Sequence, residues 1–288
     1  MKSAHFLLFC QVIVIKHCTG FSGRTTSSNL QMIFGASSGG GKVEIPKDSS
    51  ARDRQAIAGI KAAMGSSSAS SLLECEFPVL EQLNKLGDGS LRSAKEAEQA
   101  NLDFVMKLIK ELKPFPFLGP RVWLMTSSAS SKSFDSAAAM KSKAAGAVYH
   151  SLRNGLPTDL DGGDIVLLLN PSSRGDYSAA KTVAFSEVSP SVVIINGFAK
   201  DQKSVPDSAT MAYYYKPLTY NSQIAGYLIR KFPEKWTTID AATKETVLVT
   251  SDNDILVRGT NTPDLRNSVR AIQKAFDTRA IMERKSRT

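Results

Sequence analysis

The chain has 288 residues, of which 42% are hydrophobic and 22% charged, and its formal net charge is +9. This composition is typical of a soluble globular protein and excludes a disordered or collagen-like chain. The excess of bases lies at the two ends: residues 1–43 hold four bases and no acid, residues 266–288 hold seven bases and two acids, and residues 44–265 are neutral overall. We therefore expect no nucleic-acid-binding face on the body of the protein. We expect no transmembrane segment either, because no apolar run reaches the roughly 18 residues that a bilayer requires.

Residues 1–20 have the pattern of a signal peptide. The apolar stretch Phe6–Ile15 is ten residues long, which suits a signal-peptide core and is too short for a transmembrane helix. Small residues at Cys18 and Gly20 follow it. They predict a cleavage point before Phe21.

Residues 21–44 have the pattern of a transit peptide that ends in a Gly/Ser-rich junction. This stretch is basic and rich in hydroxyl groups, and no acid occurs before Glu44. A signal peptide followed by a transit peptide with Phe at its first position resembles the bipartite plastid presequence of algae whose plastids lie within the secretory system. An ordinary secreted protein with a polar mature end is the alternative.

The chain from residue 51 to residue 195 alternates between helix and strand patterns. The runs Ile165–Leu169 and Val192–Ile195 are apolar at every position, as in strands that are buried on both faces. They predict a mostly parallel sheet covered by helices on both faces, which is a Rossmann-like three-layer α/β fold. The predicted elements, in chain order, are a helix over 51–64, a strand over 72–77, a helix over 93–112, a strand over 121–125, a helix over 133–152, a strand over 164–169, a helix over 176–187 and a strand over 191–195.

The C-terminal part has a different pattern. Its predicted elements are a half-buried edge strand at Tyr213, Tyr214 and Tyr215 (212–216), a helix near 221–231 that Tyr220 and Asn221 open, strands over 236–239, 246–249 and 255–257, and a helix over 262–284 with Thr262 as N-cap and Pro263 in its first turn. The three short strands are joined by polar turns and predict an antiparallel meander at one edge of the sheet. We find no linker after residue 70, so residues 51–288 are expected to form a single α/β domain that ends in a basic helix.

Loss of residues 1–44 would leave Cys75 and His150 as the chain's remaining cysteine and histidine. A zinc site made of His and Cys ligands needs three or four of them and is therefore excluded. A carboxylate site for magnesium stays open, although no clustered acidic motif points to one. His150 falls in the predicted helix over 133–152, where a surface position is favoured over a catalytic one. We expect no catalytic residues, no metal and no cofactor.

Polar residues follow three of the predicted parallel strands. They are Ser127 after the first strand, Asn170, Arg174 and Asp176 after the second, and Asn196 after the third. If the three strands are neighbours, these side chains meet at one rim, where open parallel sheets bind their ligands. Arg174 could then hold a phosphate or carboxylate as a forked donor. Ordinary turn and cap chemistry is the alternative explanation for the same residues.

An ordered set of segments resembles a plant and algal plastid family. The segments are Leu72–Leu80, Gln99–Phe104, Asp164–Pro171, Val193–Asn196 and Tyr215–Arg230, with Trp236 soon after. The family is catalogued as domain of unknown function 1995 and includes the low photosystem II accumulation type of protein. The resemblance covers about residues 51–240 and implies a plastid protein that in some members acts in photosystem II biogenesis. It carries over no agreed catalytic residues.

Three functions remain open at this point. The first is a non-enzymatic auxiliary protein of the plastid stroma, or of the stromal face of the thylakoid, that assists photosystem II assembly or maintenance. The second is an enzyme that handles a nucleotide or a phosphometabolite at the strand-end rim. The third is a module that binds a small ligand at that rim without turnover.

The C-terminal helix has an apolar stripe and a basic remainder. Leu265, Val269, Ile272 and Phe276 recur at helical spacing and are expected to dock on the body. The bases expected to contact an anionic thylakoid surface or a thylakoid protein complex are Arg279, Arg284, Lys285 and Arg287. A solvated helix with a frayed basic end is the alternative.

Overall fold

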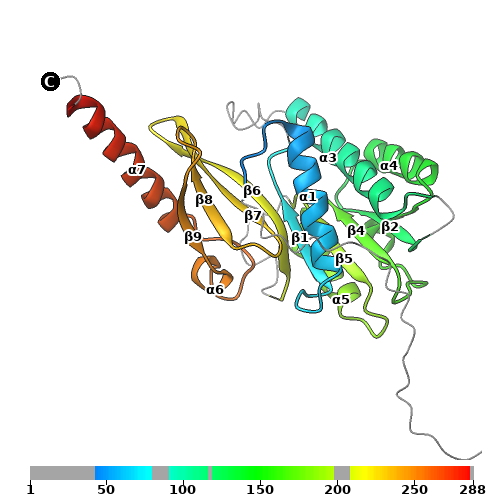
Figure 1. Ribbon diagram of the computed structural model, residues 1–288. Coiled ribbons are helices and arrows are strands. Elements are labelled where there is room, and N and C mark those ends of the chain that lie inside the picture. The colour runs from blue at the N-terminus through cyan, green and yellow to red at the C-terminus, as the bar shows by residue number, and fades with distance from the viewer. Residues whose placement is uncertain (1–42, 80–90, 116–118, 198–207, 286–288) are drawn as a thin grey trace, which may run out of the picture. The chain divides into compact units, whose positions relative to one another are not determined.

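The computed structural model describes residues 43–79, 91–115, 119–197 and 208–285. Within these ranges the strands form one nine-stranded sheet in the order β3-β2-β4-β5-β1-β6-β7-β8-β9 (Figure 1). The strands are β1 (Leu72–Glu76), β2 (Val122–Thr126), β3 (Val148–Ser151), β4 (Ile165–Leu169), β5 (Ser191–Ile195), β6 (Thr210–Tyr220), β7 (Gln223–Lys231), β8 (Trp236–Asp240) and β9 (Thr246–Thr250). The expected signal peptide (1–20) and nearly all of the expected transit peptide and junction (21–44) lie outside the described residues, which begin at residue 43.

The sheet has a parallel half and an antiparallel half that meet at β6. Strands β3, β2, β4, β5, β1 and β6 pair in parallel, while β6, β7, β8 and β9 form an antiparallel meander. The first strand in the sequence is thus an inner strand, because β1 lies between β5 and β6. The predicted α/β class and the C-terminal meander are both confirmed.

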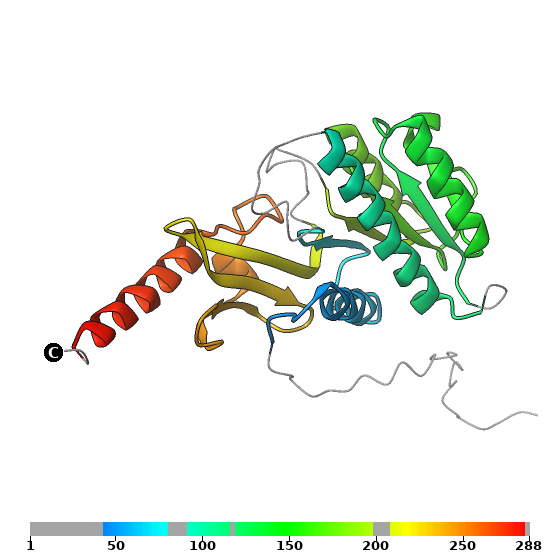
Figure 2. The same cartoon turned by 90° about the horizontal axis from the view of Figure 1, so that it is seen from above.

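Helices cover both faces of this sheet. They are α1 (Ser49–Met64), α3 (Leu91–Leu112), α4 (Lys132–Ala144), α5 (Arg174–Ala184), the short α6 (Asp252–Ile255) and α7 (Arg266–Lys285), with one 3-10 turn at Leu152–Asn154. We call the two faces the α1 face, which α1, α3 and α4 cover, and the α5 face, which α5 covers over the parallel strands and α6 and α7 cover over the meander. Figure 2 shows the sheet between these helices.

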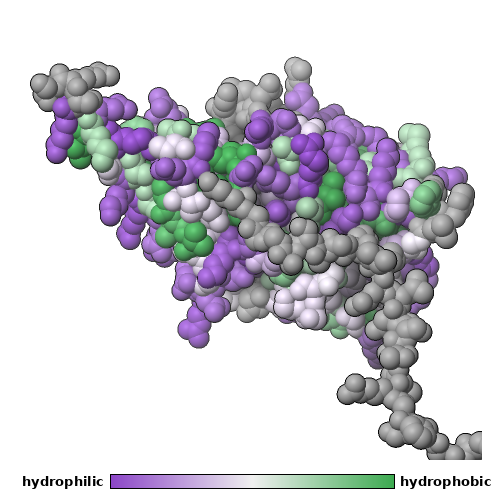
Figure 3. Space-filling model, viewed as in Figure 1, coloured by the Kyte–Doolittle hydropathy of each residue, from purple (hydrophilic) through white to green (hydrophobic). Residues whose placement is uncertain are grey.

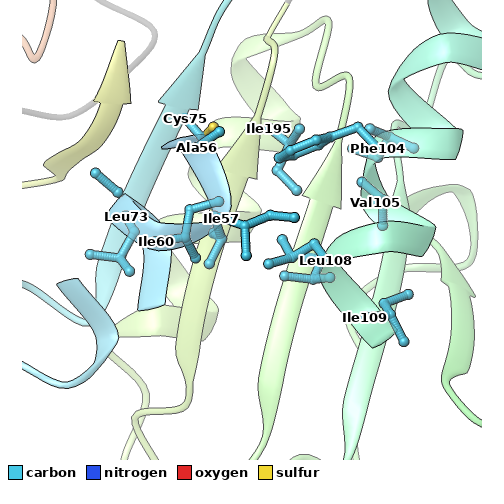
Figure 4. Packing of buried hydrophobic residues seen from close by; sticks show 14 of the residues in the cluster. Ala56, Ile57, Ile60, Leu73, Cys75, Phe104, Val105, Leu108, Ile109 and Ile195 are labelled. Carbon is cyan, nitrogen blue, oxygen red and sulfur yellow. The ribbon is translucent and has the colours of Figure 1, made fainter. Parts of the chain in front are cut away.

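Residues that alternate along the strands supply three apolar clusters, one on the α1 face and two on the α5 face. On the α1 face, Leu73 and Cys75 of β1 and Ile195 of β5 pack against α1 and α3 (Figure 4). On the α5 face, Leu72 packs with residues of α5 in a second cluster. A third cluster joins the meander to α6 and α7. The described members of all three clusters lie between residues 56 and 272, so residues 43–288 contain the whole of the described core.

Helix α1 lies close to the sheet because of one glycine. A Cβ atom added to Gly59 would lie 2.5 Å from the carbonyl oxygen of Ala212 in β6. Glycine usually weakens a helix interior. At this position it permits the contact between α1 and the strand that joins the two halves of the sheet.

The predicted helix over 133–152 is wrong in its second half. Helix α4 ends at Ala144, and Gly146 adopts a left-handed backbone with φ of 69°. Glycine commonly ends a helix in this way. The chain then enters β3, so His150 lies on a strand, where its Nε2 is 2.8 Å from the carbonyl oxygen of Gly155.

The predicted helix near 221–231 is wrong as well, because this segment forms β7. Asn221 and Ser222 have φ values of 50° and 61°, which is the backbone of a tight hairpin turn. The rings of Tyr215 and Tyr227 stack across the hairpin with their centroids 5.5 Å apart. The leucine and isoleucine spacing of this segment also suits a helix, and burial along β7 does not follow a strict alternation that would have indicated a strand.

Three smaller expectations are corrected too. The tyrosine-rich strand β6 lies inside the sheet rather than at its edge, and Tyr213 and Tyr214 are buried. The predicted strand over 255–257 is replaced by the end of α6 and a single bridge between Leu256 and Pro263. Since Pro263 is used in that bridge, the last helix begins at Arg266 instead of 262.

Candidate functional site

The rim predicted from the sequence lies where two neighbouring strands send the chain to opposite faces of the sheet. Strand β2 leads into α4 on the α1 face, and its neighbour β4 leads into α5 on the other face. In open α/β sheets, ligands bind in the crevice that such a divergence creates at the carboxyl ends of the strands. The strands that end at this rim, β2, β4 and β5, are neighbours as the prediction required.

The carboxylate of Asp176 joins the two loops of this rim. It accepts hydrogen bonds from the hydroxyl of Ser127 (2.7 Å) and from the amide and hydroxyl of Ser128 (3.0 and 2.8 Å), all in the loop after β2. From the loop after β4 it accepts hydrogen bonds from the backbone N–H groups of Ser172 (3.0 Å) and Ser173 (3.1 Å). Five donors occupy the lone pairs of one carboxylate, so Asp176 holds the loops together and has no capacity left for a further donor.

These hydrogen bonds also set the protonation state of Asp176. Burial by itself raises the pKa of a carboxyl group. Here the bonds from Ser128, Ser172 and Ser127 outweigh burial and hold the pKa of Asp176 below its ordinary value. Asp176 therefore stays ionised at neutral pH and is unsuited to act as a general acid.

A second buried network links three asparagines at the same end of the sheet. Asn196 donates through Nδ2 to Oδ1 of Asn101 on α3 (2.6 Å), and Asn101 donates through Nδ2 to Oδ1 of Asn170 (2.6 Å). The backbone N–H of Phe77 donates to Oδ1 of Asn196 (2.8 Å). Because a backbone N–H can only donate, it fixes the orientation of all three amides in turn. The network ends at Nδ2 of Asn170, which is buried without a hydrogen-bond partner in the described part of the chain.

Turn chemistry explains why asparagine stands at two of these positions. Asn170 and Asn196 follow their strands directly and have left-handed φ values of 53° and 46°. Asparagine tolerates this backbone better than other residues with a side chain. Their backbone N–H groups continue the hydrogen-bond ladder of the sheet: that of Asn170 donates to the carbonyl oxygen of Ile195 (3.0 Å), and that of Asn196 donates to the carbonyl oxygen of Cys75 (2.9 Å). Turn chemistry, which was the alternative explanation for these residues, is therefore present together with the hydrogen-bond network.

The structure brings together four of the five predicted rim residues in two pairs. Ser127 bonds directly to Asp176, and Asn170 is connected to Asn196 through Asn101. Arg174 begins α5 and is exposed. Sequence reasoning missed Asn101, because a single asparagine in a long amphipathic helix gives no signal of its burial.

A buried acid on β1 is a further site that the sequence did not reveal. Glu74 points to the α5 face and accepts a hydrogen bond from Nδ2 of Asn261 (2.7 Å). Burial, with the charge of Glu76 adding to it, raises the pKa of Glu74 to about 8 against the opposing effect of the Asn261 bond. Glu74 is consequently protonated at neutral pH. Its side chain lies on the opposite face of the sheet from Leu73 and Cys75, because successive side chains of a strand alternate between the faces.

The described ranges contain no group of three or more His, Cys, Asp or Glu residues arranged to hold a metal ion. Cys75 is a buried free thiol, and burial raises its pKa well above the ordinary value. No helix within those ranges has the length and apolar character to cross a bilayer.

The four C-terminal bases predicted to contact a thylakoid surface or complex differ in their surroundings. Arg279 forms an ion pair with the buried carboxylate of Asp240 at the end of β8. Arg284 and Lys285 are exposed in the last turn of α7, and Arg287 lies outside the described residues. The predicted apolar stripe docks as expected, with Ile272 buried and Phe276 edge-on to Tyr220 at 5.4 Å.

Comparison of the chain with family models, with curated proteins and with solved structures finds no match.

Proposed function

We propose that the protein is a non-enzymatic plastid factor that works in the stroma or at the stromal face of the thylakoid and assists photosystem II assembly or maintenance. The resemblance of residues 51–240 to the plastid family described above supports the location and the process. The observation that carries the non-enzymatic part is the saturation of Asp176. This acid, which bridges the loops after β2 and β4, accepts five hydrogen bonds that hold the two loops together.

The proposal is tested by disrupting the gene and measuring each photosystem with its assembly intermediates. We expect photosystem II to fall relative to photosystem I and its early intermediates to accumulate. Unchanged photosystem II in the disrupted line would contradict the proposal.

Complementation of the disrupted line separates a scaffold from an enzyme. Ser127→Ala removes one hydroxyl of the rim, and Ser133→Ala removes an exposed hydroxyl in the first turn of α4 as a matched control. If the rim is a scaffold, both variants restore photosystem II in proportion to the amount of protein that accumulates. Normal accumulation of Ser127→Ala without any recovery would point to catalysis at the rim instead.

A ligand-binding module is the second candidate, because Nδ2 of Asn170 is a buried donor for which the described residues supply no acceptor. A bound molecule with a carbonyl or hydroxyl oxygen could supply it. Thermal shift of residues 43–288 against nucleotides and plastid phosphometabolites tests this function. A melting temperature that rises with ligand concentration, and does so less in Asn170→Gly, would favour the module over the pure assembly factor. Glycine keeps the left-handed backbone and removes the amide.

A further inference from the structure

Helix α7 presents two faces of different character. Its inner face docks on the meander through the stripe that contains Ile272, and Arg279 forms an ion pair with Asp240 of β8. Beyond that pair the helix runs away from the strands (Figures 1 and 2). Every residue from Ile281 to Lys285 is exposed.

The face opposite the docked stripe is basic. At 100° per residue, one line along the helix collects residues on the side away from Ile272. Among them are Arg270, Lys274, Asp277, Ile281, Arg284 and Lys285, all of them exposed, which we call the outer face of α7. Four bases stand against one acid over about 22 Å of helix, at 1.5 Å per residue.

The outer face also carries apolar surface near its end. Ile281 is 54% exposed, and its neighbour Met282 is 64% exposed. Figure 3 shows hydrophobic surface between hydrophilic atoms on this projecting end of α7. Basic side chains with long apolar stems around an exposed isoleucine are the combination that interfacial helices use.

We infer that the outer face of α7 binds the surface of an anionic lipid bilayer. The bases lie at the headgroups, and Ile281 with Met282 enters the interface at the free end of the helix. A bilayer is favoured over a protein partner because the bases are spread along one exposed side of a single helix and two exposed apolar side chains, Ile281 and Met282, lie near its free end. This inference rests on the proposed function and names the surface at which the protein works.

The attachment is peripheral in this arrangement. The apolar stripe on the inner face is already used by the meander, so α7 cannot turn that side to the membrane without unfolding. Exposed charges are screened by salt, so rising salt weakens the electrostatic part of binding. The part that comes from Ile281 and Met282 remains.

The test is flotation of residues 43–288 with vesicles of phosphatidylcholine alone and of phosphatidylcholine mixed with phosphatidylglycerol. Each basic residue near an anionic surface changes the partition coefficient about fivefold. The triple variant Arg270→Gln/Lys274→Gln/Arg284→Gln is therefore expected to bind the mixed vesicles about a hundredfold more weakly. Ile281→Ser is expected to bind the mixed vesicles about tenfold more weakly, and this loss of binding is expected to persist at high salt.

A control variant changes charge elsewhere. Lys110→Gln/Lys143→Gln/Lys181→Gln removes three exposed bases from α3, α4 and α5 and is expected to float like the native chain. All the substituted residues are exposed, so circular dichroism is expected to show unchanged folding. Equal binding to both kinds of vesicle, an equal loss in the control variant, or no binding by the native chain would each overturn the inference.

Two further outcomes separate this inference from the proposed function. Binding to isolated thylakoids without binding to the mixed vesicles would assign the outer face to a protein and overturn the bilayer as its partner. Full recovery of photosystem II in the disrupted line by the triple variant would leave the assembly function intact and remove the need for attachment. The gene-disruption result itself does not depend on α7.

Discussion

The buried acid Glu74 makes folding stability depend on pH in an unusual direction. A free glutamate releases its proton near pH 4.5, whereas in the folded protein Glu74 keeps it until about pH 8. Between these values the folded state holds one proton more than the unfolded state, so stability falls as pH rises. The contribution of Glu74 is fully present below about pH 4.5, declines by about 1.4 kcal/mol per pH unit through this window, and is constant above it.

Glu74→Gln tests this reasoning. Glutamine has the shape of the protonated acid, and its Oε1 can still accept the hydrogen bond from Asn261. From pH 5.5 to pH 7.5 the native chain is expected to lose as much as about 3 kcal/mol more than the variant in its free energy of unfolding. The variant is then the more stable of the two at pH 7.5.

The measurement is urea unfolding of residues 43–288 at a series of pH values, followed by tryptophan fluorescence. Glu245→Gln, in an exposed turn before β9, is the control and should keep the native pH dependence. Parallel pH curves for the native chain and Glu74→Gln would refute the reasoning, because they would mean that Glu74 is ionised in the folded protein.

Three other substitutions or reactions have expected outcomes. Asp176→Asn replaces one carboxylate oxygen by an NH₂ group that faces the serine donors. We expect this to lower the free energy of unfolding in urea by about 2–4 kcal/mol at pH 7. Because the pKa of Asp176 is held low, the stability that its charge contributes is present above about pH 4 and is lost as the pH falls further. If the native chain and Asp176→Asn differ in stability at pH 2 as much as at pH 7, the charge of Asp176 does not hold the loops. Gly59→Ala is expected to lower stability by about 1–3 kcal/mol, although alanine normally favours a helix, since its methyl group would meet the carbonyl of Ala212; a more stable variant would show that α1 can shift. The thiol of Cys75 is expected to react with a disulfide reagent only in denaturant, and rapid reaction in the native protein would contradict its burial.

The parallel half of the fold was predictable because strands that are buried on both faces have continuous apolar sequences. Strands such as Ile165–Leu169 are apolar at every position, and each is followed by polar turn residues. The meander was harder. Ile224 and Leu228 of β7 and the following Phe232 have helical spacing. The turn of Asn221 and Ser222 contains no glycine that would indicate a hairpin.

The rim residues were predictable one at a time, but their roles were not. The position of Asp176 in the first turn of a helix indicates a cap, and the Ser173 capping box confirms it. That the same carboxylate also receives Ser127 and Ser128 depends on the pairing of β2 with β4, which brings together residues far apart in the sequence. Glu74 gave no signal because its burial comes from elements that lie more than a hundred residues later.

The inner position of β1 has a consequence for how the chain is made. Its partners in the sheet lie far downstream, with Leu72 of β1 beside Val192 of β5. At the usual speed of synthesis, about 5–20 residues per second, β1 leaves the ribosome about 6–24 s before that partner exists. Throughout this time both edges of β1 lack their partners, and an unpaired strand edge is a template for aggregation. Folding of the sheet must wait for the second half of the chain, so the protein is expected to need chaperone protection while it is being synthesised.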